Sequence, residues 1–305
     1  MEPMIVDAHV HLAGALANPW VDDDLNAFAR ARHPTRAVQV SRERGDLLEE
    51  ELRREYDEMP RAVSKFVFVE CCNTPALDEA RWALALAQSP DSRCAAVVAH
   101  IPAFDGADAV RAFLGALRGG GPEDPLPPAL KGGRQVMLGD PMPEPDHCLT
   151  CAAFAGALDV LEAEGLLWEW CCHYTALPSV AKVCAAHPGM TFVLDHLGRN
   201  GGTEDDVDAW RAAIAEVAKC PNVYAKTGAL EEWGVKDPAP LLDTAISLFG
   251  FDRLIWESNW FVSKACGFSV GELVSLAEAA CARAGANEED RAKWFGRNAA
   301  RAYTL

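Results

Sequence analysis

The sequence lacks a hydrophobic run long enough to cross a membrane. No stretch reaches the 18 consecutive apolar residues that a spanning helix needs, and no basic segment followed by a long apolar one stands near Met1. The 305 residues are nevertheless 50 % hydrophobic and 24 % charged, as in a globular protein with a substantial core. We therefore predict a cytoplasmic protein without a membrane partner.

Positive charge is scarce. The 28 lysines and arginines are outnumbered by 45 aspartates and glutamates, which gives a net charge of −17. Such a molecule repels nucleic acid and anionic membrane surfaces, so neither is an expected partner. A small-molecule substrate remains, and the formation of a homo-oligomer stays open.

Paired cysteine motifs are missing too. The chain has eleven cysteines, an odd number, and many stand in apolar, strand-like surroundings such as 67–72, 92–98 and 166–172. This pattern favours reduced, buried thiols over a disulfide framework. Cys148 and Cys151 form a single CxxC motif without a second one to complete a zinc site, so a zinc or redox role is the less favoured alternative.

Eight short apolar segments recur along the chain, and most gaps between them show apolar residues at helical spacing. The segments are 4–10, 65–71, 94–100, 129–137, 166–172, 190–196, 222–228 and 253–259. Strands that alternate so regularly with helices predict an α/β fold, namely a closed (β/α)8 TIM barrel that forms a single domain over 1–305. A doubly wound open sheet is the alternative, but no GxGxxG motif follows the first strand.

Two stretches exceed what a barrel needs. Residues 12–65 separate the first two strands and contain a charged amphipathic helix at 45–59; we interpret them as a helical insertion that partly covers the active-site face, or else as a surface decoration. Pro/Gly-rich loops flank the fourth strand within 119–150, and we expect specificity to depend on both regions. The last segment, 288–305, predicts a terminal helix on the outer ring.

The first strand carries the pattern His-x-His. Side chains alternate along a strand, so Asp7, His9 and His11 are expected on one face. Two imidazoles at i and i+2 can both reach one metal ion at about 2.0–2.1 Å. Two histidines that merely bond to backbone at a strand end are the alternative.

Other polar residues stand at the ends of later strands, where a barrel gathers its catalytic groups. His173 follows the fifth strand, His196 ends the sixth, and Glu257 and Asn259 share a face at the end of the eighth. Asp195 directly precedes His196, so alternation predicts that it faces away from the site. These positions favour one polar cluster at the carboxyl ends of the strands.

Six segments in the same order resemble the amidohydrolase superfamily. They are IVDAHVHL, LKGGRQVM, VLDHLGRN, NVYAKTGAL, DRLIWESNWF and FGRNAARAYTL. The resemblance is to the amidohydrolase-2, or amidohydrolase-related, group, which includes sugar lactonases and 2-pyrone-4,6-dicarboxylate lactonase. It implies a (β/α)8 barrel that hydrolyses a lactone, an amide or a related bond, with His9, His11 and His196 as ligands of one divalent metal such as zinc or manganese. His173 is a looser match to the family's remaining histidine.

Asn259 stands where the family pattern has an aspartate. An asparagine accepts no proton near neutral pH and its oxygen is a weaker metal ligand, so the site needs another explanation. Three remain open: Glu257 supplies the carboxylate, the histidines bind substrate in a metal-free reaction, or the barrel has lost catalysis and only binds a ligand. We favour a hydrolase in which Glu257, with a raised pKa, activates water beside His196. A structural ion pair of Glu257 with Lys226 or Arg134 is the alternative.

Four residues are candidates for substrate contact, and His173 is one of them. By resemblance, Arg134 at the end of the fourth strand meets a substrate carboxylate, which its planar guanidinium suits, so an anionic lactone is expected. Lys226 can polarise a carbonyl, or else neutralise Glu257 or Asp195. Trp260 can wall the pocket or pack beneath a loop. A decarboxylase of the same superfamily is a further possibility for the reaction.

Overall fold

The strands close into a barrel. The computed structural model describes residues 5–14, 18, 20–121, 123–137, 149, 151–198, 207–233 and 237–305. Within them eight strands form one parallel sheet in chain order: β1 (Ile5–Val10), β2 (Val63–Val69), β3 (Cys94–His100), β4 (Leu130–Met137), β5 (Leu167–Cys172), β6 (Phe192–Leu194), β7 (Val223–Lys226) and β8 (Leu254–Ile255). A parallel bridge between Val10 and Trp260 joins the last segment to the first. The predicted (β/α)8 barrel is confirmed.

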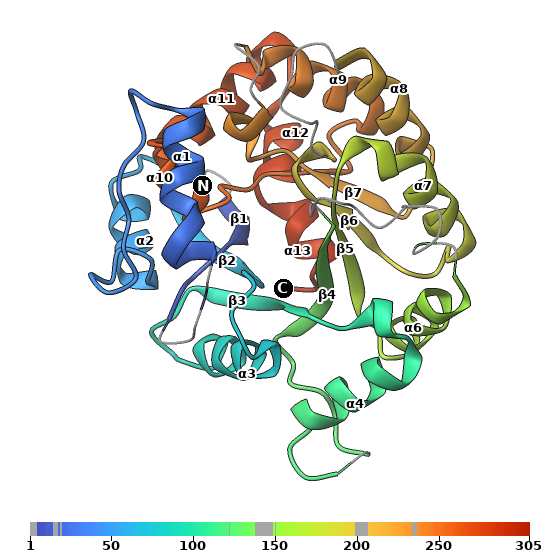
Figure 1. Ribbon diagram of the computed structural model, residues 1–305. Coiled ribbons are helices and arrows are strands. Elements are labelled where there is room, and N and C mark those ends of the chain that lie inside the picture. Colours follow the sequence, from blue (N-terminus) through green and yellow to red (C-terminus); the bar gives the residue numbers. More distant parts are fainter. Residues whose placement is uncertain are drawn as a thin grey trace.

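Helices surround the strands, as Figure 1 shows. The longer ones are α1 (Leu25–Arg32), α2 (Glu49–Asp57), α3 (Ala76–Ala87), α4 (Ala107–Leu117), α6 (Ala152–Ala163), α7 (Leu177–Ala186), α8 (Val207–Ala218), α9 (Ala239–Phe249) and α11 (Val270–Arg283). The short ones are η1 (Trp20–Asp24), η2 (Ala103–Asp105), η3 (Tyr174–Ala176), η4 (Asp195–Leu197), η6 (Leu230–Trp233), α10 (Val262–Ala265), α12 (Glu288–Ala292), η7 (Lys293–Arg297) and α13 (Asn298–Ala302). None of these helices combines the length and the apolar character that crossing a bilayer requires.

The alternation of strand side chains divides the core into two layers. On β5, Trp168 and Trp170 point outward and pack against Phe154 of α6, with ring centroids 5.7 and 5.8 Å apart. Glu169, between them, points into the barrel and contacts Lys226. This register decides which charged side chains of the strands reach the interior.

The C-terminal segment closes the barrel from below. The prediction that this segment lies on the outer ring holds for Trp294 and Phe295, which pack in the outer core, and is wrong for Ala299 and Tyr303, which belong to the small apolar cluster inside the cylinder. That cluster is built from short and branched side chains such as Val6, Ala8 and Val193, and the volume they leave is filled by the Tyr303 ring. The Tyr303 hydroxyl donates a hydrogen bond to Glu169, so the plug is tied to the buried polar groups above it.

The stretch between β1 and β2 holds η1, α1 and α2, and the predicted amphipathic helix at 45–59 appears as α2. Its Tyr56 hydroxyl donates to Asp7 Oδ2 over 2.8 Å, and its Glu55 accepts the indole N–H of Trp260 over 3.0 Å. These contacts join the insertion to both β1 and the segment after β8.

The described cysteines form no disulfide, and most are buried. This agrees with the prediction of reduced thiols. Cys148 lies outside the described residues, so the CxxC motif is not described as a unit.

The plug should matter to stability in two separable ways. We expect Tyr303→Ala to lower the free energy of unfolding by about 3–5 kcal/mol, because it leaves a cavity and an unpaired Glu169 oxygen. Tyr303→Phe keeps the packing and should cost about 1–2 kcal/mol. Urea denaturation measures both, with Tyr224→Phe as a control that should stay within about 0.5 kcal/mol of the parent protein. Equal, small changes in the free energy of unfolding for both Tyr303 variants would contradict the proposed role of the Tyr303 ring in filling the barrel.

Candidate active site

His9 and His11 both reach the mouth of the barrel because β1 is irregular. Asp7 pairs with Phe66 and Val10 with Phe68, so three steps along β1 match two along β2. This irregularity places the Asp7 side chain on a different face from the two histidines. The Asp7 carboxylate accepts hydrogen bonds from the Tyr56 hydroxyl and from the Ser258 N–H, away from the interior. The prediction that Asp7 shares their face is therefore wrong, while the histidine pair converges as expected, with 3.1 Å between the two Nε2 atoms.

The hydrogen bonds fix the proton positions on both rings. Nδ1 of His11 lies 2.9 Å from the carbonyl oxygen of Val69, which only accepts, so Nδ1 carries the proton. Nε2 of His9 lies 3.1 Å from Arg134 Nη1, and a guanidinium only donates, so the neutral His9 ring carries its proton on Nδ1, which lies 3.1 Å from Glu257 Oε2 and 3.0 Å from Lys226 Nζ. Burial lowers the pKa of both imidazoles, assisted by Lys226 at His9 and by His9 and Arg134 at His11. Each neutral ring therefore turns the lone pair of its Nε2 toward the other ring.

Arg134 crosses the barrel mouth and is largely satisfied by the protein itself. Its Nε donates to Glu70 Oε1 over 2.9 Å and its Nη2 to the Glu70 carbonyl over 2.6 Å. Its Nη1 donates to Asp195 Oδ2 over 3.0 Å and lies 3.1 Å from His9 Nε2. Four of the five N–H groups of the guanidinium are thus engaged.

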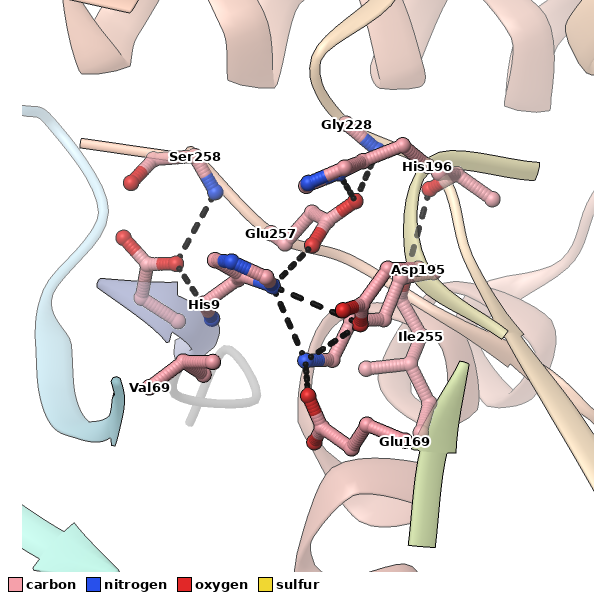
Figure 2. Close-up of polar contacts among 12 residues, drawn as sticks. His9, Val69, Glu169, Asp195, His196, Gly228, Ile255, Glu257 and Ser258 are labelled. Atoms are coloured by element: carbon pink, nitrogen blue, oxygen red, sulfur yellow. Dashed lines mark hydrogen bonds and ion pairs between the residues drawn. The ribbon is translucent and has the colours of Figure 1, made fainter. Parts of the chain in front are cut away.

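Lys226 lies deeper, beneath His9. Its Nζ is 2.7 Å from Glu169 Oε2, 3.1 Å from Asp195 Oδ1 and 3.0 Å from His9 Nδ1 (Figure 2). All of these side chains are almost completely buried. Lys226 therefore neutralises carboxylates, which is the second of the two roles expected for it, and those carboxylates are Glu169 and Asp195.

Asp195 faces the interior, so the prediction that it faces outward is wrong. Val193 belongs to the inner cluster, and Asp195 continues that alternation as β6 ends at Leu194. His196 then adopts a left-handed conformation with φ of 53°, and this turn brings its ring inward too. Two consecutive residues thereby reach one site because the second has left the extended backbone.

His196 and Glu257 form a pair held from behind. Nδ1 of His196 lies 2.8 Å from Glu257 Oε1, which also accepts the Gly228 N–H over 2.9 Å (Figure 2). A Cβ on residue 228 would come within 2.4 Å of Glu257 Cγ, so glycine is needed for this approach. Because an ionised carboxylate only accepts, His196 donates from Nδ1 and has its lone pair at Nε2.

Glu257 is held in its ionised form. Burial acts to raise its pKa, but His196 and His9 outweigh burial and hold the pKa of Glu257 below its ordinary value. This differs from the raised pKa that the sequence analysis expects of a general base. The carboxylate is therefore better suited to orienting His196 and balancing its charge than to taking a proton itself.

A cavity of about 450 Å³ opens over this cluster. Its described lining combines residues of the polar site with thiols and apolar side chains: His11, Arg134, His196, Asn259, Cys71, Cys72, Cys171, Trp20, Phe28, Val136 and Val262. Asn259 has φ of 54°, a left-handed conformation that asparagine tolerates better than most residues. Glu257 is completely buried behind His196 and is not part of this lining.

Five predicted site residues are absent from the described cavity lining: His9 and Glu257, which are completely buried, and Lys226, His173 and Trp260. Lys226 lies below the cavity. His173 follows the end of β5 and bonds through Nδ1 to Thr175 Oγ1 over 2.9 Å; Cys171 is the β5 residue that lines the cavity instead. Trp260 packs in the outer core and donates to Glu55, so it contributes to the packing of α2.

The sequence analysis missed several contributors. Glu70, which accepts a hydrogen bond from Arg134, directly follows β2. It thus stands at a strand end, as the predicted site residues His196 and Glu257 do. Glu169 lies between two tryptophans, and an alternation of this kind does not tell which face of the strand points into the barrel. Gly228 follows Lys226 and Thr227 at a strand end, where a glycine is a signal of close approach.

The paired imidazoles fit a divalent metal ion. Two nitrogens bound to one zinc ion stand roughly 3–3.5 Å apart, since each Zn–N bond is about 2.0–2.1 Å long. The 3.1 Å between the facing lone pairs of His9 and His11 agrees with this. His11 donates its other N–H to the Val69 carbonyl, and Nδ1 of His9 lies 3.1 Å from Glu257 Oε2, which resembles the usual outer-shell arrangement of metal-bound histidine. His9, His196 and Glu257 also form a cluster whose ligand atoms lie within 4.8 Å of one another.

Buried ionisable groups gathered at the carboxyl mouth of a (β/α)8 barrel define the site of a TIM-barrel enzyme. The chain belongs to the amidohydrolase family, whose model, described as Amidohydrolase, matches residues 6–305. An L-fucono-1,5-lactonase from Burkholderia multivorans is 31 % identical over 169 residues, which are 50 % of this chain and 56 % of the relative. A second L-fucono-1,5-lactonase, from Burkholderia ambifaria, is 28 % identical over a region that covers 49 % of this chain and 53 % of that relative. The match thus spans about half the length of these curated relatives.

Solved structures match over the full length. A zinc-bound amidohydrolase from Burkholderia multivorans has a TM-score of 0.74 and 25 % identity, with 99 % of each chain covered. The 5-carboxyvanillate decarboxylase from Sphingomonas paucimobilis shares the fold, with a TM-score of 0.60 and 14 % identity over 99 % of each chain.

Metal content can be measured directly. We expect about one equivalent of zinc or manganese in protein purified without chelators, and its loss in the His9→Ala/His11→Ala double variant, because that variant removes both facing lone pairs. Inductively coupled plasma mass spectrometry gives the stoichiometry, and His173→Ala serves as a matched histidine control. Equal metal content in all three proteins would place the ion elsewhere.

The free energy of unfolding should depend on pH through Glu79, which contacts the end of β2. Glu79 of α3 accepts the Cys71 N–H over 3.0 Å and lies at 2.5 Å from the Asn73 amide nitrogen. Burial, with the nearby Glu70 carboxylate, raises the pKa of Glu79 to about 7. The folded state therefore binds this proton more tightly than the unfolded state, and stability falls as pH rises from about 4.5 through 7.

Glu79→Gln keeps the accepting oxygen and removes the titration. We expect the free energy of unfolding of the parent protein to fall, relative to that of Glu79→Gln, by about 2–3 kcal/mol between pH 4.5 and pH 8. Urea denaturation at several pH values provides the measurement. Parallel curves for the two proteins would show that Glu79 does not titrate in this range.

Proposed function

We propose that the protein hydrolyses a lactone or a related cyclic ester, with His196 as the general base. The observation that carries this proposal is the His196–Glu257 pair: its imidazole lines the cavity while its carboxylate stays buried behind. The names of the L-fucono-1,5-lactonase relatives support the same reaction class.

The reaction follows from the proton positions. His196 Nε2 accepts a proton from a water molecule as the water oxygen attacks the lactone carbonyl carbon, and Glu257 balances the imidazolium that forms. The tetrahedral intermediate collapses with cleavage of the bond between carbonyl carbon and ring oxygen. His196 returns its proton to the departing alkoxide, so the product is an open hydroxy acid.

Negative charge develops on the carbonyl oxygen in this step, and two cavity residues can receive it. Arg134 has a fixed positive charge and one N–H group beyond those bound within the protein. Asn259 contributes an amide N–H group, which an aspartate at this position could not donate. Pre-positioned donors of this kind act without reorganising during the reaction.

A divalent metal ion fits the same site. His9 and His11 would hold it, with His196 as the third predicted ligand, and it would supply Lewis-acid polarisation of the carbonyl and a bound hydroxide. Arg134 donates to His9 Nε2, the atom an ion would also bind, so guanidinium and metal compete for it. The steps assigned above to His196 and Glu257 require protein groups only.

A panel of lactones with a pH indicator tests the reaction class. We expect release of acid that is proportional to enzyme and exceeds spontaneous hydrolysis. Tight binding of a lactone without turnover would favour a barrel that only binds its ligand. Release of carbon dioxide from aromatic carboxylates would favour the decarboxylase alternative.

The catalytic roles of His196 and Glu257 can be distinguished from a general loss of folded protein. We expect Glu257→Gln to lower kcat at least about a hundredfold, because glutamine cannot balance the imidazolium charge, and His196→Asn to lower it at least as far. The double variant should be no worse than His196→Asn alone, since the two act as a unit. Steady-state kinetics measure this, with Glu278→Gln as the matched control. Near-normal turnover of Glu257→Gln would remove the carboxylate from the mechanism.

A further inference from the structure

The cavity has two chemically different parts. All four polar residues in its described lining belong to the reaction centre: His11, Arg134, His196 and Asn259. The rest of the described lining consists of apolar side chains and thiols, and its main members are Trp20, Phe28, Val136, Val262, Cys72 and Cys171. These residues come from the insertion, from β4 and β5, from the loop after β2, and from the first residue of α10.

Charge in the site is compensated from within. Arg134 is held by Glu70 and by Asp195, and Lys226 by Glu169 and Asp195. A substrate carboxylate needs two parallel N–H donors for a bidentate contact, and contacts with described residues engage four of the five N–H groups of Arg134. The expectation of an anionic substrate, which rested on this arginine, therefore finds little support in the geometry.

An exposed apolar side chain also lies on this wall. Val136 is 38 % exposed and is one of three large hydrophobic side chains that are exposed in the described part of the chain. The other two, Val38 and Leu48, do not line the cavity. What connects Val136 to a ligand is its place in the cavity lining, where it lies with the apolar side chains of Trp20 and Phe28.

We propose that the substrate is a neutral lactone with an apolar substituent, alkyl or aryl, and not a polyhydroxylated sugar lactone. This inference rests on the proposed lactonase function and names the substrate class of that site. The ester group lies on the polar floor, between His196 and Arg134, and the substituent lies against Trp20, Phe28 and Val136.

Hydroxyl groups on the substrate ring would face this wall. Each hydroxyl that leaves water without a new hydrogen bond costs about 1–3 kcal/mol, so several such groups oppose binding. Each buried methylene, by contrast, contributes about 0.8 kcal/mol. The wall therefore selects against sugar lactones and in favour of an apolar substituent.

Three δ-lactones test the proposal: δ-valerolactone, δ-undecalactone and D-glucono-1,5-lactone, each corrected for spontaneous hydrolysis. We expect kcat/KM to be at least about tenfold higher for δ-undecalactone than for δ-valerolactone, and lowest for the sugar lactone. A sugar lactone hydrolysed as efficiently as δ-undecalactone would overturn the proposal.

Substitutions in the insertion test whether its side chains contact the apolar substituent. Phe28→Ala and Trp20→Ala should each lower kcat/KM for δ-undecalactone about tenfold and leave that for δ-valerolactone within about twofold, with Val38→Ala as the exposed control. Equal losses for both lactones would also overturn the proposal.

Failure of the proposed function gives a different result. If none of the three lactones is hydrolysed, calorimetric titration with the same compounds still tests the wall. Binding of δ-undecalactone that Phe28→Ala weakens would uphold the apolar site without lactonase activity. Stronger binding of the sugar lactone, or no binding of δ-undecalactone, would reject it.

Discussion

Charge neutralisation inside the barrel is the constraint on which the site depends. Arg134 and Lys226 are buried together with carboxylates, and Asp195 lies between them, 3.0 Å from one and 3.1 Å from the other. An unpaired charge at this depth would cost several kcal/mol, so each group holds its neighbours in place. Removing Asp195 would leave two cations facing each other across His9.

The same network sets the state of the imidazoles. Lys226 and Arg134 contact the two ring nitrogens of His9 and favour its neutral form, while the ionised Glu257 lies 3.1 Å from Nδ1. On the other side of Glu257, His196 is held in the tautomer that presents Nε2 toward the cavity. One carboxylate thus orients two histidines, and this explains why it is buried behind the reaction centre instead of lining it.

The fold could be predicted from the sequence because its signals are periodic and numerous. Eight apolar runs separated by helical patterns leave few alternatives to a barrel, and the pairing of all neighbouring strands confirms it. The site could be predicted only where strands stay regular. His9 and His11 were found as a pair, but the irregularity in β1 moved Asp7 away, and the left-handed turn at His196 let Asp195 point inward. Local departures of this kind depend on tertiary packing and leave no mark in a two-residue alternation.

The change of aspartate to asparagine at the end of β8 is coherent with the rest of the site. A carboxylate at position 259 would add another negative charge near Glu257, which already accepts from His196 and Gly228. With Glu257 ionised and buried, the residue that faces the cavity can be a neutral donor. A neutral amide and an internally paired arginine leave the reaction centre without an excess of positive charge that could attract an anion. The described wall above it consists mainly of apolar side chains and thiols, so in the proposed reaction the floor supplies the catalytic groups and the wall contributes to the selection of the substrate.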